Sequence, residues 1–337
     1  MKTLIIGGTG LISTYTTQLL AARGDDVTLY NRGQSIYPTP VGVKTILGDR
    51  THYETFVTQI AEAGVFDVVI DMVGYHPDDA ECVVRAFRGR TVQFIFCSTV
   101  DVYLKPATLY PYTEAEAYGG LNDYASNKVK IEKRLWQAHQ AGDFPVTIIR
   151  PAYTYGEGRG PLHSLGWGTA YMDRIRRGLP VVVHGDGTAL WTACHAADVG
   201  AAFAAACGKE ITFGKAYHTA GEEWMPWNTY HARVAEALAA PPPRLVHIPT
   251  DLLVRVAPRR CGIIQQNFQF NNIFDNTAAH TDLSFCYTVD WLTGVRRMAA
   301  WLDANGGTQK AEDDPFEHRL VQAWERFGSD LERSFSE

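Results

Sequence analysis

The first half of the chain alternates short, continuous apolar runs with segments in which apolar residues recur at helical spacing. Continuous apolar runs are typical of strands that are covered on both faces. The predicted strands span residues 4–6, 27–30, 45–47, 68–70, 94–97 and 146–149, and the predicted helices span 11–23, 52–63, 77–87 and 124–140. This alternation predicts an α/β fold, a Rossmann-like doubly wound parallel sheet with crossover helices.

The second half of the chain differs from the first in its residue composition. Gly, Pro and aromatic residues are dense over 153–161, which predicts a functional loop. Strands are predicted at 180–184 and 216–219, and helices at 170–177, 196–206 and 227–239, where Pro241–Pro243 ends the last helix. Apolar residues from Phe316 to Leu331 recur at helical spacing and predict a C-terminal amphipathic helix.

Composition and charge narrow the class of protein. The net charge of −6 argues against a general nucleic-acid surface, which is usually basic. No segment approaches the roughly 18 uninterrupted apolar residues of a membrane span. The chain begins directly with a core strand, so we expect a cytoplasmic protein. Its six cysteines are scattered and its histidines lack metal-ligand spacing, so we expect neither disulfides nor a metal site.

A glycine-rich turn follows the first predicted strand. Glycines at such a turn let the backbone approach a dinucleotide pyrophosphate, and the following helix directs its free N–H groups at that anion. Ser13 stands where a third small residue usually packs helix against strand, and we expect slightly looser packing there. The expected contacts to the cofactor are Gly7, Gly8, Thr9, Gly10, Leu11 and Ile12.

The end of the second strand bears on the choice of cofactor. An acidic residue there binds a bare ribose 2′-hydroxyl. Asn31 takes that place, and Arg32 beside it is suited to a 2′-phosphate, which favours NADP over NAD. Asp49, after the third strand, is either an acceptor for the adenine amino group or a turn residue.

The most informative feature is Tyr124 followed four residues later by Lys128, because residues at this spacing share one face of a helix. Upstream, the strand at 94–97 ends in the two hydroxyls of Ser98 and Thr99. In this order, after a dinucleotide turn, these residues predict hydride transfer on an alcohol or ketone.

The chain resembles the extended short-chain dehydrogenase/reductase family, of the NAD-dependent epimerase/dehydratase type. The resemblance rests on the glycine turn and on the motifs at 98–103, 124–128, 150–156, 185–188 and 195–199. The motifs at 31–33, 48–50 and 102–105 look most like a subgroup that includes the chloroplast stem-loop-binding proteins. In that subgroup the tyrosine of the catalytic pair is lost, whereas this chain keeps Tyr124.

The resemblance implies roles for these residues. Tyr124 would be the general acid/base, and Lys128, with the positive nicotinamide, would favour its tyrosinate and hold the nicotinamide ribose. Thr99 would hydrogen-bond the reacting oxygen, with Ser98 as its substitute. Further cofactor contacts would come from Arg50, Met72, Val73, Gly74, Pro151 and Tyr153.

The resemblance also implies two domains and a partner. Residues 1–155, with returning segments of about 180–220, would form the NAD(P)-binding Rossmann domain. Residues of about 156–180 and 221–337 would form a smaller α/β domain that binds the substrate. A homodimer is expected, paired through the helices at 77–87 and 124–140.

Two positions depart from the nucleotide-sugar epimerases of the family. Trp191 stands where an arginine usually pairs with the substrate diphosphate, and Tyr153 stands where an asparagine is usual. Trp191 is either a stacking surface for the substrate or a core residue. Asp101, Arg159 and His163 are further substrate candidates, and arginines at 174, 176 and 177 are possible replacement charges. His195 is expected to be a structural hydrogen bonder.

Together these observations predict an NAD(P)-dependent oxidoreductase or epimerase that acts on a secondary alcohol or ketone of a sugar or a sugar-nucleotide-like substrate. A dehydratase is disfavoured, because Val100-Asp101 follows Thr99 where sugar dehydratases carry an Asp-Glu pair. The alternative is a non-catalytic nucleotide-sensing or RNA-binding protein on the same fold.

Overall fold

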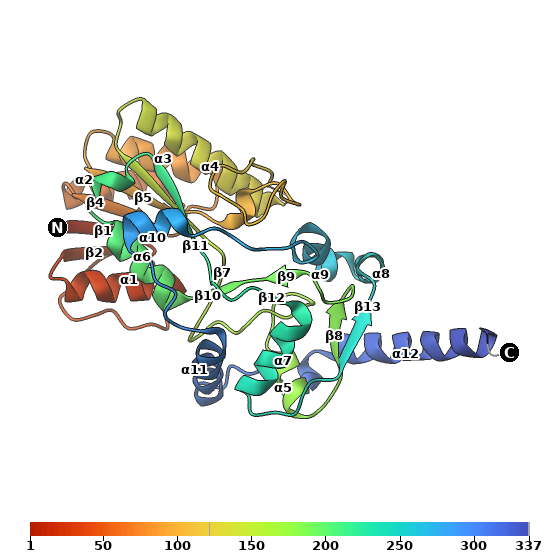
Figure 1. Cartoon of the computed structure of the whole chain (residues 1–337). Coiled ribbons are helices and arrows are strands. Elements are labelled where there is room, and N and C mark those ends of the chain that lie inside the picture. The colour runs from red at the N-terminus through yellow and green to blue at the C-terminus, as the bar shows by residue number, and fades with distance from the viewer. Residues whose placement is uncertain (121, 336–337) are drawn as a thin grey trace. The chain divides into compact units, whose positions relative to one another are not determined.

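A computed structural model of the chain describes residues 1–120 and 122–335 (Figure 1). The chain divides into two compact units. Unit 1 comprises Met1–Thr154, Ala193–Glu222 and Ile273–Val289, and unit 2 comprises Tyr155–Thr192, Glu223–Asn272 and Asp290–Glu337. Residues 121, 336 and 337, which fall within the expected domains, lie outside the described residues.

Unit 1 is built on a parallel sheet that has seven strands in the described part of the chain, in the order β11-β6-β5-β4-β1-β2-β3. The strands are β1 (Lys2–Ile6), β2 (Asp26–Asn31), β3 (Lys44–Leu47), β4 (Val68–Asp71), β5 (Gln93–Cys97), β6 (Val146–Pro151) and β11 (Lys215–Thr219). The predicted Rossmann-like sheet is confirmed. The chain order reverses between β1 and β4, which is where sheets of this type bind ligands.

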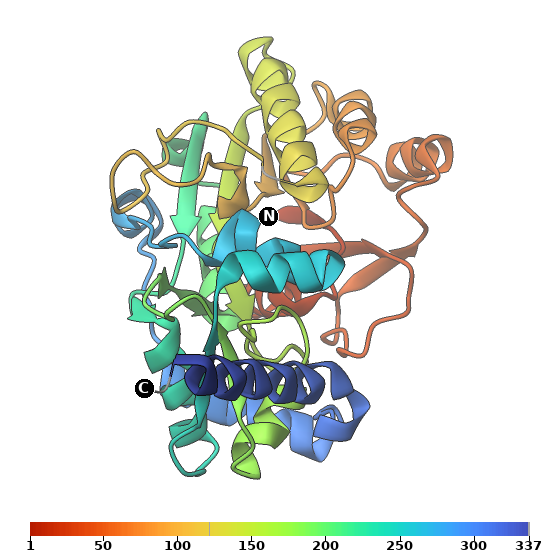
Figure 2. The ribbon, with the colours of Figure 1, turned by 90° about the vertical axis from the view of Figure 1, so that its right-hand side faces the viewer.

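Helices cover both faces of this sheet (Figures 1 and 2). One face carries α2 (Tyr53–Ala63), α3 (Pro77–Phe87) and α4 (Asp123–Gln140). The other carries α1 (Leu11–Ala22), α6 (Ala196–Ala206) and α10 (Thr277–Leu283). The Asn122 side chain caps α4 by accepting a hydrogen bond of 2.9 Å from the Ala125 N–H, which fixes where this helix begins.

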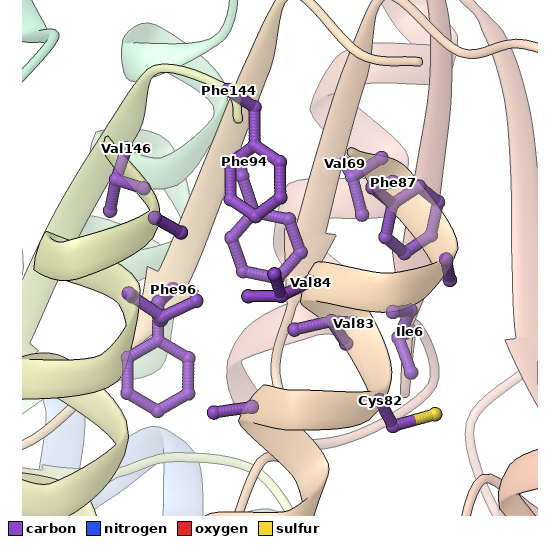
Figure 3. Close-up of a cluster of buried hydrophobic side chains, with 14 of the residues drawn as sticks. Ile6, Val69, Cys82, Val83, Val84, Phe87, Phe94, Phe96, Phe144 and Val146 are labelled. Carbon is purple, nitrogen blue, oxygen red and sulfur yellow. The ribbon is translucent and has the colours of Figure 1, made fainter. Parts of the chain in front are cut away.

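The core of unit 1 follows from the alternation of side chains along each strand. On β5, Phe94 and Phe96 point to the face that α3 covers, and Ile95 and Cys97 point to the other face. Figure 3 shows the first of these two clusters, in which Phe87 of α3 packs near β5. Both faces are apolar because both are covered, and this explains why the strands are continuous apolar runs in the sequence.

Unit 2 contains two short sheets and several helices. Strand β8 (Val181–His184) pairs in parallel with β13 (Leu245–Ile248), and β9 (Leu190–Trp191) pairs antiparallel with β12 (Met225–Pro226). The α-helices are α5 (Ala170–Arg176), α7 (Trp227–Ala237), α8 (Thr250–Val256), α9 (Pro258–Ile263), α11 (Trp291–Ala304) and α12 (Pro315–Phe335). Among the helices that the structure describes, none combines the length and the apolar character needed to cross a bilayer.

The remaining elements are short. Strand β7 (Tyr153–Tyr155) pairs with β10 (Ala193–His195), so the first residues of the predicted loop at 153–161 form a strand. The other short helical segments are η1 (Val100–Val102), η2 (Glu210–Thr212), η3 (Ile264–Phe268) and η4 (Ala311–Asp313).

The division into units differs from the expected domains in two segments. The part of the chain at 180–192 belongs to unit 2, because β8 pairs with β13 rather than joining the large sheet. Residues 273–289 return to unit 1, where α10 packs against β11 and α6. Neither of these two segments carries a periodic pattern long enough to assign it to a unit from the sequence.

Candidate active site

The turn between β1 and α1 requires glycine at two positions. Gly7 has a φ of +80°, and a Cβ there would lie 2.5 Å from Val73 Cγ1. A Cβ on Gly8 would lie 2.4 Å from Leu29 Cδ2. The backbone of the turn is therefore packed directly against neighbouring side chains, with no room for a larger residue.

Ser13 closes this turn through its hydroxyl group. The hydroxyl donates to the Gly7 carbonyl at 2.6 Å and accepts from the Gly10 N–H at 2.7 Å. The packing at Ser13 is therefore tight, not looser as expected from its size: the residue is 2% exposed. Gly10, the N-cap residue of α1, has no side chain that could accept from the N–H groups of the first helical turn, which includes Leu11 and Ile12. That arrangement fits a pyrophosphate.

Residues at the end of β2 stand beside the glycine turn. The Asn31 side-chain oxygen accepts a hydrogen bond of 2.9 Å from the Gly33 N–H and so shapes the exit from the strand. Arg32 is exposed. Within the glycine turn, the Thr9 carbonyl accepts a hydrogen bond of 2.6 Å from the hydroxyl of Ser35, which follows β2. Asn31 thus has a structural role, and Arg32 keeps an accessible positive charge.

Asp49 and Arg50, which follow β3, both make contacts within the protein. Asp49 Oδ1 accepts from the Thr51 N–H at 2.9 Å and from its hydroxyl at 2.7 Å, which is the turn role foreseen for it. These hydrogen bonds lower the Asp49 pKa and use only its Oδ1, so the turn role is seen and the adenine role stays a prediction. Arg50 is 7% exposed, and its guanidinium binds both oxygens of Asp71 at 2.8 and 2.6 Å. The expected cofactor contact of Arg50 is therefore not supported, because this side chain is buried in an ion pair.

The residues after β4 come next to the glycine turn, because β4 pairs with β1. Asp71 Oδ1 accepts a hydrogen bond of 2.9 Å from the Val73 N–H, which turns the chain as it leaves the strand. Met72 is 8% exposed. A Cβ on Gly74 would lie 2.8 Å from Phe96 Cε2, so Gly74 sits directly on the side chain of a residue in β5.

Thr99, Tyr124 and Lys128 gather at the carboxyl end of β5. The Thr99 side chain lies near the Tyr124 hydroxyl and acts to lower the Tyr124 pKa. Thr99 is 7% exposed, and its hydroxyl also accepts from the Asp101 N–H at 3.2 Å. Tyr124 lies in the first turn of α4, and the Lys128 Nζ lies 5.8 Å from the centroid of its ring. The structure thus brings together the three residues expected to act on the substrate.

The surrounding protein groups shift the pKa values of both Tyr124 and Lys128. Although 43% of Tyr124 is exposed, its hydroxyl meets the buried Thr99, and burial followed by the charge of Asp101 raises the Tyr124 pKa. Lys128 is 1% exposed, its Nζ donates to the Cys97 carbonyl at 2.7 Å, and burial lowers its pKa. The protein groups around Tyr124 therefore favour its protonated form, whereas the expected tyrosinate depends on the nicotinamide charge as well as on Lys128.

The Ser98 hydroxyl makes its hydrogen bond to a residue other than Tyr124. Its hydroxyl donates to the carboxylate of Glu132, which lies one turn after Lys128 on α4, and Ser98 is 3% exposed. The Thr99 side chain, not that of Ser98, is therefore the one that acts on the Tyr124 hydroxyl. The expected role of Ser98 as a substitute for Thr99 is not supported by this geometry.

A buried polar network extends from Glu132. The Arg150 guanidinium donates to both Glu132 oxygens at 3.0 and 2.6 Å, and to the hydroxyls of Tyr103 at 2.7 Å and Tyr118 at 2.9 Å. The Tyr103 hydroxyl is in turn hydrogen-bonded to the His218 ring. The network joins α4, β6 and β11 below the candidate site. The network could not be predicted from the sequence, where its only signal is that Arg150 precedes Pro151.

A sequence model of the NAD dependent epimerase/dehydratase family matches residues 3–218, a stretch that includes the glycine turn and the three residues around Tyr124. The chain belongs to this family.

Two curated relatives are similar over most of the chain. One is 2'-dehydrokanamycin reductase from Streptomyces kanamyceticus, 29% identical over 241 residues, which cover 72% of this chain and 68% of that protein. The other is the chloroplast stem-loop binding protein of 41 kDa b from Arabidopsis thaliana, 28% identical over 259 residues, which cover 73% of this chain and 65% of that protein. The chain spans about two thirds of the length of these relatives.

Solved structures share the fold. UDP-glucose 4-epimerase from Bifidobacterium longum, in complex with NAD+ and UDP, is 20% identical with a TM-score of 0.73, and the match covers 92% of this chain and 100% of that chain. Epimerase Mth375 from Methanothermobacter thermautotrophicus is 16% identical with a TM-score of 0.74, over 90% of this chain and 92% of that chain. At these identities, the likeness establishes the fold.

Two residues expected to contact the substrate are buried in unit 2. Trp191 is 4% exposed, with its ring centroid 5.0 Å from those of Trp227 and Phe268. His163 is 5% exposed, stacks on Tyr171 at 4.7 Å and has its pKa lowered by burial. The core interpretation of Trp191 therefore holds, and neither residue presents a surface to a ligand.

The arginines proposed as replacement charges are paired within unit 2. Arg174 is 1% exposed and lies 3.4 Å from Glu317. Arg176 binds Asp303 at 2.6 Å, and Arg177 binds Asp173 and Glu312. Arg159 is exposed, with its guanidinium 5.0 Å from the centroid of the Trp167 ring, and it keeps an accessible charge.

Two further substrate candidates, Asp101 and Tyr153, lie in unit 1. Asp101 is half-buried, and one of its oxygens lies 3.7 Å from the Nζ of Lys105, a buried lysine whose pKa is lowered to about 8 by burial. Pro151 ends β6, and the half-buried Tyr153 begins β7.

His195 accepts a hydrogen bond of 3.2 Å from the Ala197 N–H and caps α6, as expected for a structural residue. The described residues contain no cluster of three or more side chains suited to a metal.

Proposed function

We propose that the protein is an NAD(P)-dependent oxidoreductase or epimerase that acts by hydride transfer at a secondary alcohol or ketone of a sugar or sugar-nucleotide-like substrate. The observation that carries this proposal is the grouping of Thr99, Tyr124 and Lys128 at the carboxyl end of β5, where the Lys128 Nζ lies 5.8 Å from the centroid of the Tyr124 ring. Membership of the NAD dependent family and a reductase among the relatives support it.

The residues at the carboxyl ends of the strands fit the cofactor. The turn at Gly7 and Gly8 and the first-turn N–H groups of α1 would hold the pyrophosphate. Arg32 and Asn31 would meet the adenosine ribose, Asp49 the adenine, and residues 72–74 and Lys128 the nicotinamide half, with Pro151 and Tyr153 beside it. When bound, the nicotinamide supplies or accepts the hydride.

Residues of the chain itself would carry out the proton transfer to the substrate oxygen. Tyr124 holds a proton on its Oη, because its pKa is raised. Thr99 would donate a hydrogen bond to the substrate oxygen and fix it beside that Oη. A ketone that gains a hydride at carbon and the Tyr124 proton at oxygen becomes a secondary alcohol. The protonated Tyr124 therefore favours the reductive direction as the first one to assay, and an epimerase requires the reverse step as well.

The cofactor preference follows from the end of β2. Asn31 carries no charge to repel a 2′-phosphate, and the exposed Arg32 guanidinium is free to approach one. NADP is therefore the preferred cofactor in this proposal. We also propose a homodimer paired through α3 and α4, to be checked by light scattering.

The proposal is tested by turnover. The purified protein is assayed with NADPH and NADH against ketones of sugars, cyclitols and aminoglycosides, and against UDP-, GDP- and dTDP-sugars. Reduction of a ketone that carries no diphosphate supports a substrate outside the nucleotide sugars, whereas activity only with nucleotide sugars contradicts that part. A protein that binds stem-loop RNA at physiological salt and turns over none of these compounds would support the non-catalytic alternative suggested by the second relative.

A further inference from the structure

The Lys128 ammonium lies among aromatic rings. Its Nζ is 4.6 Å from the Phe96 ring centroid, 4.9 Å from that of Tyr75 and 5.8 Å from that of Tyr124. The Cys97 carbonyl accepts a hydrogen bond from it at 2.7 Å. A buried ammonium in such a site is stabilised by the ring faces in place of water. We call Phe96, Tyr75 and Tyr124 the aromatic box.

Tyr75 and Tyr124 are the two members of the box that reach the surface, and Tyr75 has no assigned role in the proton transfer. Its ring centroid is 6.4 Å from that of Tyr124, and the residue is 48% exposed while Lys128 beside it is 1% exposed. Its backbone N–H donates to Asp79 at 2.7 Å, and Asp79 is itself paired with the buried Arg50 at 3.4 Å. The backbone of Tyr75 is therefore anchored to a buried ion cluster, which holds the ring over Lys128.

We propose that Tyr75 is a positioning residue of the active site, whose ring keeps Lys128 in its charged form and in place against Tyr124. The inference rests on the proposed function, because it assigns a second residue to the same site. Phe96 is fully buried in the core and Tyr124 is the proposed acid, so Tyr75 is the member of the box that can be changed with least disturbance to either.

Other groups also act on Lys128. The carboxylates of Asp71 on β4 and Glu132 on α4 favour the ammonium, and the Arg50 guanidinium opposes it. The Cys97 thiol on β5 stays neutral, because burial raises its pKa to about 11. These groups are the same in variants of Tyr75, so a change in the titration of Lys128 reports on the ring.

The test measures the titration of Lys128 directly, in protein free of cofactor. Wild type, Tyr75→Leu and Tyr75→Phe are labelled with an amine-reactive reagent over a range of pH, and modification of Lys128 is followed by mass spectrometry. The exposed Lys130, two residues along α4, is the internal reference in each sample. Greater access alone would raise the labelling rate at all pH values, whereas loss of the ring face shifts the pH midpoint.

We expect Tyr75→Leu to lower the midpoint of Lys128 labelling by about one pH unit, the size of a desolvated cation–π contact. Tyr75→Phe keeps the ring and should keep the wild-type midpoint. In turnover assays, Tyr75→Leu should lower kcat by about tenfold at neutral pH, with a smaller change in KM, and Tyr75→Phe should restore it. An unchanged or raised midpoint in Tyr75→Leu overturns the inference. The midpoint does not depend on turnover, so a failure of the proposed function would be seen separately.

Discussion

Arg150 and Glu132 form an ion pair at 2.6 Å in which both side chains are almost completely buried. Glu132 also accepts from Ser98, the neighbour of Thr99, and lies one turn after Lys128 on α4. The pair therefore connects β5, α4 and β6 at the place where the proposed catalytic residues meet. Its contribution is to fix these elements relative to one another, because each of its polar atoms has a defined partner.

Removing one partner of this pair should destabilise the fold. Glu132→Ala leaves the Arg150 charge buried and unpaired, and we expect the free energy of unfolding to fall by about 3–5 kcal/mol. Urea denaturation followed by circular dichroism measures it. The matched control is Glu81→Ala, which removes the exposed pair of Glu81 with Arg134 at 2.7 Å and should cost at most about 1 kcal/mol. Equal losses in the two variants would contradict the role of burial.

The proposed acid is tested by removing one oxygen. Tyr124→Phe keeps the ring beside Lys128 and removes the proton that the substrate oxygen would receive. We expect kcat to fall by about 10²–10⁴-fold, with the dissociation constant of the cofactor unchanged. Stopped-flow assays and a calorimetric titration give the two quantities. Wild-type turnover in this variant would assign the proton transfer to another group.

The cofactor preference depends on Arg32. Arg32→Glu should weaken NADPH binding by about 10- to 100-fold, since a charge-assisted hydrogen bond is lost, and should leave NADH binding nearly unchanged. Fluorescence titrations with both cofactors measure this. Lys44→Glu, which makes the same charge change at an exposed residue paired with Asp26, is the control. If both variants weaken NADPH equally, the effect comes from net charge and not from a contact at Arg32.

Lys105 should make stability depend on pH. Its pKa is about 8 in the folded chain, whereas an unfolded lysine titrates at about 10.4. Between these values the unfolded chain binds more protons, so this group makes stability rise with pH, and below pH 8 its full destabilising effect is present. Lys105→Met should therefore stabilise the protein at neutral pH by up to about 3 kcal/mol.

The advantage of Lys105→Met should shrink as the pH rises from 8 toward the lysine value of the unfolded chain. Thermal unfolding of wild type and variant across this range measures the difference. Lys130→Met, at an exposed lysine, should show no such trend. A constant difference between Lys105→Met and wild type would mean that Lys105 stays charged throughout.

The sheet and the glycine turn could be predicted because their signals are local. Strands covered on both faces are continuous apolar runs, and the bounds of α3 and α6 follow from helical periodicity and from their flanking turns. The turn at Gly7 and Gly8 was recognisable because only glycine fits between a strand and a helix so closely packed.

Other residues could not be placed from sequence, because their roles depend on partners distant in the chain. Arg50 was expected to meet the cofactor but is held by Asp71. For Trp191 the sequence left open a stacking face or a core position, and the residue is packed on Trp227. Tyr75 was missed because a single tyrosine after a strand carries no pattern. The charge on a side chain is visible in the sequence, whereas its burial is not.

We propose that unit 1 binds a nicotinamide dinucleotide and uses it for hydride transfer. The most direct measurement is to denature freshly purified protein, identify any released nucleotide by mass spectrometry, and titrate the empty protein with NADPH and NADH. We predict that NADPH binds with a stoichiometry of one per chain and more tightly than NADH. Tightly retained NAD would favour an epimerase and contradict the NADP preference, and protein that neither retains nor binds either nucleotide would contradict the account as a whole.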